Sequence, residues 1–115
     1  MSNYYPELNQ RILDMSDGDE EFREELTQAI YNGLVELKKV YAEGTVEKDL
    51  VKIQQIRHKL KPTLSMFEFD LLTETLQEGK ELLETQGFDG KFALHFEDFL
   101  EKVDLAIQEV EKLTK

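Results

Sequence analysis

The chain has 115 residues, which fits one domain spanning residues 1–115 and leaves no room for a second. Its 25 acidic and 14 basic residues give a formal charge of -11, which excludes a nucleic acid or an anionic membrane surface as the expected partner. No cysteine is present, so disulfides, thiolate metal ligands and thiol nucleophiles are excluded. Nothing near the N-terminus resembles a secretory signal, and no apolar run approaches the ~20 residues of a membrane span. We therefore expect a cytoplasmic protein.

Apolar residues recur every three or four positions through nearly the whole sequence, a spacing that predicts helices and no strands. A short helix is expected from Pro6 to about Asp14. The first long helix is expected from about Asp19 to Glu43, with Gly44 ending it. Its inward stripe would consist of Phe22, Leu26, Ile30, Gly33, Leu37 and Val40.

Three further long helices follow. The second would begin after Asp49 as N-cap and the third near Asp70, another expected N-cap. The third would end at Gln86-Gly87, and the fourth would start after Asp89-Gly90. The second would turn inward Leu50, Ile53, Ile56, Leu60, Leu64 and Phe67, and the fourth Phe92, Phe96, Phe99, Val103, Ile107 and Val110.

Four long helices with short connections predict an all-α fold, an antiparallel up-down-up-down four-helix bundle with a short extra N-terminal helix. No helix shows the inward Glu-x-x-His spacing of metal-binding bundles, and no nucleotide-binding glycine motif occurs. We therefore expect no metal, no cofactor and no enzyme with a nucleotide site.

His58 lies on the wrong face of its helix for a core residue. At 100° per residue it stands about 140° from Ile53 and about 160° from Ile56, so it should point to solvent. Its neighbours on that face include Gln54, Gln55, Lys61, Pro62 and Ser65. Imidazole is a nucleophile in its neutral form, and an ammonium group one turn away can pair with a phosphoryl group.

The segment DLVKIQQIRHKLKPTLSMFEFDLL, residues 49–72, resembles the signature of the histidine-containing phosphotransfer (HPt) domains of two-component phosphorelays. That family carries a motif of the form H-x-L-K-G-S, with an aspartate about nine residues earlier that opens the helix. His58, Leu60 and Lys61 match the motif, and Asp49 falls at the place of the aspartate. GDEEFREEL, residues 18–26, is similar to the family's opening of the preceding helix.

The resemblance implies a phosphorelay intermediary. His58 would accept a phosphoryl group from a receiver-domain aspartate and pass it to another receiver, and Lys61 would stabilise that group. The partners would be receiver domains of a hybrid sensor kinase or a response regulator, with Mg²⁺ bound only in the receiver. Residues expected at the partner interface are Gln54, Gln55, Arg57, Pro62 and Ser65.

Two positions depart from the family pattern. Pro62 stands where the family has a small residue, and it predicts either a kink or break after Lys61 or the start of a new helical turn. Glu68 stands where the family often has a second glycine. A helical interaction module of the same fold, with His58 never phosphorylated, is therefore the alternative function, and Pro62 is the residue that most favours it.

The charge is unevenly distributed along the chain. Residues 50–67 carry Lys52, Arg57, Lys59 and Lys61 without any acidic residue. The helix with His58 is thus basic although the chain as a whole is acidic. Its positive charge has the sign needed to attract an acidic receiver site. The other histidine, His95, lies at the edge of an apolar stripe and is interpreted as a structural or partly exposed residue and not as a metal ligand. The two histidines do not make a metal site.

Overall fold

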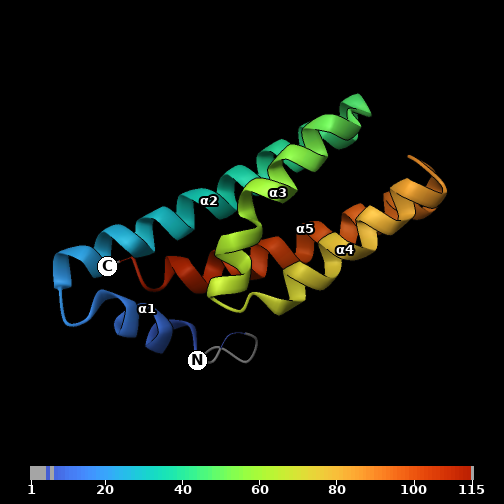
Figure 1. Cartoon of the computed structure of the whole chain (residues 1–115). Coiled ribbons are helices and arrows are strands. Elements are labelled where there is room, and N and C mark those ends of the chain that lie inside the picture. The colour runs from blue at the N-terminus through green and yellow to red at the C-terminus, as the bar shows by residue number, and fades with distance from the viewer. Residues whose placement is uncertain (1–4, 6, 115) are drawn as a thin grey trace.

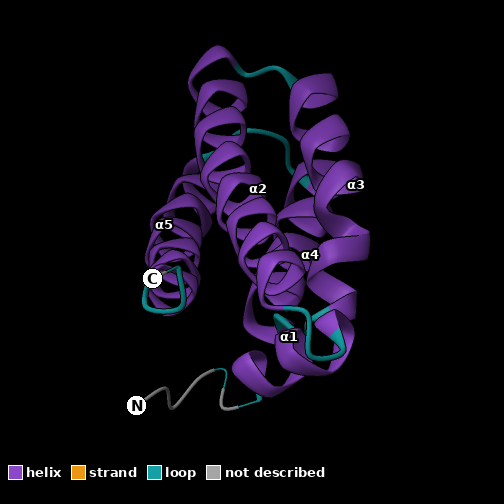
Figure 2. Cartoon of the chain, turned by 90° about the vertical axis from the view of Figure 1, so that its left-hand side faces the viewer, coloured by secondary structure: helices purple, strands orange, loops and turns teal. Residues whose placement is uncertain are grey.

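The computed structural model describes residues 5 and 7–114, and these form five α-helices joined by short loops (Figures 1 and 2). The helices are α1 (Leu8–Ser16), α2 (Glu20–Glu47), α3 (Leu50–Met66), α4 (Asp70–Thr85) and α5 (Gly90–Glu111). No strand occurs among the described residues, so the predicted all-α class is confirmed. None of the described helices combines the length and the apolar character needed to cross a membrane.

Aspartate side chains begin three of the helices. The carboxylates of Asp19, Asp49 and Asp89 accept hydrogen bonds from backbone N–H groups of the first turns that follow them. Each one satisfies a donor that the helix leaves unpaired, which confirms the N-cap predicted at Asp49. The N-cap of α4 is Phe69, and Asp70 is the first helical residue, so the prediction for Asp70 was one position late.

The end predicted for the first long helix at Gly44 is wrong. α2 continues to Glu47, and Lys48 takes the left-handed conformation that ends it, with φ 56°. Gly44 is buried because α3 approaches it closely: an added Cβ would lie 2.6 Å from Cγ1 of Ile53. Glycine is therefore needed at this position because α3 packs closely against it, and not because the helix ends there.

The core lies between the helices, because α2 packs against α1, α3 and α5, and α4 packs against α3 and α5. Phe22 and Leu50 were predicted to face inward, but they are 43% and 42% exposed, since both lie in the first turn of their helices. The largest fully buried side chains are Tyr41, Phe69, Phe92, Phe99, Ile12, Leu34, Leu37, Ile53, Leu64, Leu72, Val103 and Val110.

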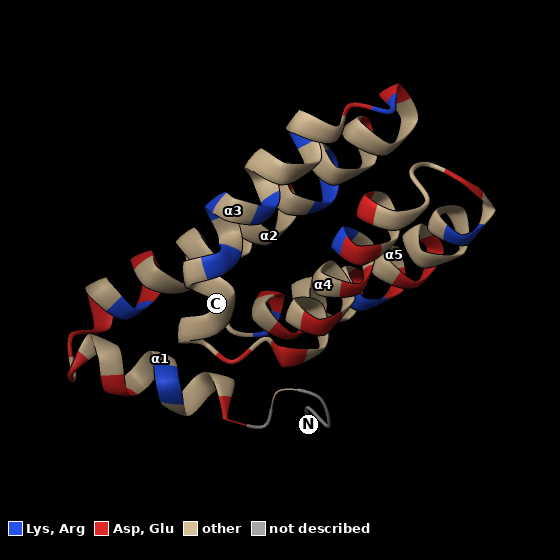
Figure 3. Cartoon of the chain, turned by 45° about the vertical axis from the view of Figure 1, so that its right-hand side comes forward, with Lys and Arg blue, Asp and Glu red and all other residues tan. Residues whose placement is uncertain are grey.

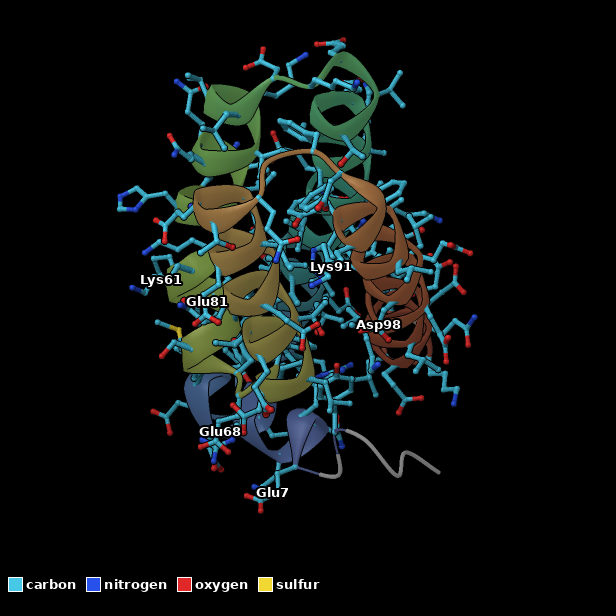
Figure 4. All side chains as sticks on the ribbon, turned by 90° about the vertical axis from the view of Figure 1, so that its right-hand side faces the viewer. Glu7, Lys61, Glu68, Glu81, Lys91 and Asp98 are labelled. Atoms are coloured by element: carbon cyan, nitrogen blue, oxygen red, sulfur yellow. The ribbon has the colours of Figure 1, made fainter. Side chains whose placement is uncertain are left out.

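The turn between α3 and α4 is tied to α1. Glu68 adopts the left-handed conformation with φ 54°, which costs a non-glycine residue about 1 kcal/mol. Its carboxylate lies 2.6 Å from Nη2 of Arg11 in α1, and Figure 4 shows Glu68 beside that helix. Glutamate at the position where the HPt pattern often has glycine thus forms a contact with α1 that glycine could not make. The predicted start of α1 at Pro6 lies outside the described residues.

Candidate functional site

His58 is exposed on α3, as its helical position predicts. The residues predicted to share its face, Gln54, Gln55, Lys61, Pro62 and Ser65, are exposed as well. Figure 4 shows Lys61 at the outer edge of α3, on the opposite side of the molecule from Asp98 of α5. The expected solvent-facing surface around His58 is therefore present.

A groove runs beside His58 between α3 and α4, with a volume of about 380 Å³. Figure 1 shows these two helices diverging toward the ends that lie away from α1. Each helix contributes residues spaced three or four positions apart, as one face of a helix requires. The lining residues are Gln54, Arg57, His58, Lys61 and Leu64 of α3, and Thr73, Leu76, Gln77 and Lys80 of α4.

The positive charges of α3 divide between two sides. Lys52 lies 3.0 Å from a carboxylate oxygen of Glu47, and Lys59 lies 2.9 Å from one of Glu36, so α2 neutralises both lysines. Arg57 and Lys61 line the groove, and neither has an ion-pair partner among the described residues. Figure 3 shows this helix with basic segments and no acidic one.

The groove gains a third cation from α4. Lys80 lines it, is partly buried, and also has no carboxylate within ion-pair distance in the described part of the chain. None of the lining residues is acidic. The surface beside His58 is thus positively charged although the whole chain is strongly acidic.

Arg57 reaches inward as well as lining the groove. Its Nη1 atom is buried and has no hydrogen-bond partner among the described residues. Its charge acts to lower the pKa of Tyr41 in α2, although burial, the larger effect, raises that pKa. An unpaired buried guanidinium donor is costly, so this atom marks a place where an acceptor would be stabilising.

The structure brings together only some of the predicted site residues. Gln54, Arg57, His58 and Lys61 line the groove, whereas the exposed Gln55, Pro62 and Ser65 do not. The contribution of α4 was missed: Thr73, Gln77 and Lys80 share a helical face, but the sequence does not show which face of α4 meets α3.

Pro62 lies inside α3 and does not break it, since the helix continues to Met66. Figure 1 shows that α3 changes direction along its length. Proline has no amide hydrogen, so the carbonyl of His58 loses the i→i+4 bond that an ordinary residue would donate. Of the predicted kink or break, the break does not occur. The bend of the helix agrees with a kink.

His95 is buried, with a side chain only 1% exposed. Its Nε2 atom lies 2.7 Å from the hydroxyl oxygen of Tyr41, a hydrogen-bond distance. Its Nδ1 atom lies 3.9 Å from a carboxylate oxygen of Glu78, which is too far for a hydrogen bond. No group of three or more His, Asp or Glu side chains positioned to hold a metal ion occurs among the described residues.

No known family model, curated protein or solved structure matches this chain. The resemblance to HPt domains therefore rests on the residues around His58 and their setting in the fold.

Proposed function

We propose that the chain is a phosphorelay intermediary in which His58 accepts a phosphoryl group from a receiver-domain aspartate and passes it to another receiver. The observation that carries this proposal is an exposed imidazole in a groove whose lining holds no carboxylate and holds three cations without an ion-pair partner among the described residues. A phosphoryl group placed there would meet positive charge on two sides, from α3 and from α4.

The proposal includes an antiparallel up-down-up-down four-helix bundle, formed by α2 to α5. It also includes a cytoplasmic location for the protein. The packing of α2 and α4 each against both α3 and α5 supports that arrangement. The chain course in Figure 1 also supports it, because the colour along α2 and α3, and along α4 and α5, runs in opposite directions.

The transfer step exchanges one bond of phosphorus for another. A nitrogen of neutral imidazole attacks the phosphorus, an N–P bond forms, and the bond to the aspartate oxygen breaks with its electron pair leaving on the carboxylate. Lys61, one turn from His58, would pair with the phosphoryl oxygens. Mg²⁺ would be bound by the receiver. The exposure of His58 gives a receiver access for an in-line approach.

The test is incubation of the purified chain with a receiver domain that carries a radiolabelled aspartyl phosphate. We expect an acid-labile, alkali-stable label on the wild type and none on His58→Gln. His95→Gln, checked for helical content by circular dichroism, is the matched control and should keep the label. Mass spectrometry of the labelled wild type should place the phosphoryl group on His58.

Two outcomes would overturn the proposal. One is a wild-type chain that takes up no label from several receiver domains. The other is a label that persists on His58→Gln. Binding of a receiver without transfer would instead support the interaction module, which Pro62 favours because it alters the backbone next to His58.

A further inference from the structure

The groove between α3 and α4 has the dimensions of a small-molecule site. Its volume of about 380 Å³ falls within the range of ligand pockets, roughly 300 to 1,000 Å³. Leu64 and Leu76 are the two apolar residues of its lining, and they are 2% and 3% exposed. Three uncharged polar side chains also line the groove: Gln54, Thr73 and Gln77. The hydroxyl of Thr73 already donates to the carbonyl of Phe69, and Nε2 of Gln77 donates to Glu81. Apolar surface with a few convergent polar groups is the usual composition of such a site.

The charge of the groove selects the class of ligand. Arg57, Lys61 and Lys80 supply three positive charges without a lining carboxylate. Lys52 and Lys59 belong to the same helix as Arg57, yet both are paired with glutamates of α2. Among the described residues, the cations of α3 without an ion-pair partner, Arg57 and Lys61, are thus the two that line the groove.

We propose that this groove binds a small organic anion with a phosphate or carboxylate head group. Arg57 and Lys80 hold the head group, and the carbon skeleton rests on Leu64 and Leu76. A bound anion is stabilised by the positive charges of Arg57, Lys61 and Lys80, none of which has an ion-pair partner among the described residues. This inference does not depend on phosphoryl transfer, because it concerns a ligand that the chain binds by itself.

Binding alone is independent of the proposed function, whereas a regulatory effect of the ligand rests on it. His58 and Lys61 line the same groove, so an occupant lies against the imidazole and the ammonium group that the proposed transfer uses. A bound anion therefore competes with an incoming phosphoryl group for the same positive charge. Phosphoryl transfer slows as the anion concentration rises.

The binding test uses the full ¹⁵N-labelled chain without any receiver domain. Phenyl phosphate and glutarate are titrated separately while amide chemical shifts are followed, with benzyl alcohol as the uncharged probe. We expect saturable shifts at groove residues with at least one of the two anions and none with benzyl alcohol. The two anions distinguish the head groups: a phosphate-selective site favours phenyl phosphate, and a carboxylate-selective site favours glutarate.

Matched charge removals locate the site. Arg57→Gln and Lys80→Gln should each weaken binding about tenfold, because each removes a charged hydrogen-bond donor to the head group. Lys59→Gln also removes one positive charge from α3, but outside the groove. It should weaken binding less than about twofold, because the ammonium group of Lys59 is screened by solvent and already paired with Glu36.

Three results would overturn the inference. The first is the absence of saturable shifts with both anions at millimolar concentration. The second is an equal loss of affinity in Lys80→Gln and Lys59→Gln, which would mean general attraction to positive charge. The third is a set of shifts that lies away from α3 and α4. Because no receiver is present, each of these results is distinguishable from a failure of phosphoryl transfer.

Discussion

The two histidines of the chain lie in opposite environments. His58 is exposed on α3, beside unpaired cations. His95 is buried in α5, where its Nε2 atom lies at hydrogen-bond distance from the hydroxyl of Tyr41. A nucleophile must be reachable by its substrate, whereas His95 is enclosed by the fold and one of its ring nitrogens, Nε2, has a hydrogen-bond partner there. The same side chain is therefore suited to chemistry at one position and to packing at the other.

The buried histidine belongs to a cluster drawn from three helices. Tyr41 of α2 and His95 of α5 meet over Gly79 of α4. The ring of Tyr41 also stacks on Phe99, with centroids 4.2 Å apart. Every part of this cluster is enclosed, whereas the groove beside His58 is open. Substitutions in the cluster should therefore change stability, and substitutions in the groove should change binding or transfer.

The largest effect on stability is expected for Gly79→Ala. An added Cβ would lie 2.5 Å from the hydroxyl oxygen of Tyr41 and closer still to Nε2 of His95, so the hydrogen-bonded pair must separate. Overpacking and the lost hydrogen bond outweigh the better helix propensity of alanine, and we expect a net loss of about 2 to 3 kcal/mol. Urea denaturation followed by circular dichroism measures it.

Gly90→Ala is the matched control for that substitution. An added Cβ at Gly90 meets no atom within 4 Å, and the residue begins α5. Its free energy of unfolding should change by less than about 0.5 kcal/mol. Equal effects at Gly79 and Gly90 would contradict the close contact between the glycine and the two aromatic side chains.

Tyr41→Phe should have the next largest effect. It keeps the aromatic ring against Phe99 and removes the hydroxyl that faces His95. The buried Nε2 atom is then left without a partner, and we expect a loss of about 1 to 2 kcal/mol in the free energy of unfolding. Tyr31→Phe, at a partly buried residue of α2 outside this cluster, is the control and should cost less. An unchanged stability in Tyr41→Phe would mean that the hydrogen bond contributes nothing.

The pH dependence of stability should follow His95. Burial lowers its pKa below the ordinary value of 6.5, and the charges of Glu78 and Asp98 oppose this shift only in part. The unfolded chain therefore binds a proton at higher pH than the folded chain does. The contribution of His95 is fully present above 6.5 and is lost as the pH falls through the lower folded pKa.

Denaturation curves between pH 7.5 and about 5, above the range where most carboxylates titrate, measure this slope. His95→Gln should flatten it. If His95→Gln kept the full slope, the buried histidine would not be its source.

The sequence predicted local features better than contacts between helices. Asp49 was predictable as a helix start because an N-cap acts on amides within three residues of itself. Gly44 was misinterpreted because its role depends on Ile53, which belongs to the next helix. The exposure of His58 followed from helical periodicity, since its own helix fixes which side it faces.

The sequence predicted the α3 side of the groove but not the α4 side. The α3 residues around His58 were found from their spacing, but Lys80 was not, because the rotation of α4 about its axis is set by packing. The sequence likewise showed how many positive charges α3 carries, but it did not show which of them form ion pairs with α2. Glutamates of α2 neutralise Lys52 and Lys59, so Arg57 and Lys61 are the cations of α3 without an ion-pair partner among the described residues.

The smallest effect on stability is expected for Lys61→Ala. Lys61 is exposed and forms no ion pair with a described residue, so its loss should change the free energy of unfolding by less than about 0.5 kcal/mol. In the proposed transfer it should lower the rate of label uptake by His58 about tenfold or more, because a charge near the phosphoryl oxygens is removed. Lys59→Ala is the control for a lost lysine on the same helix.

Two results would contradict this prediction. A Lys61→Ala chain with a clearly lower free energy of unfolding would mean that this side chain takes part in packing. A Lys61→Ala chain that takes up the label at the wild-type rate would mean that Lys61 does not contact the phosphoryl group. A stable chain with slow transfer is the result that separates the open site around His58 from the enclosed cluster around His95.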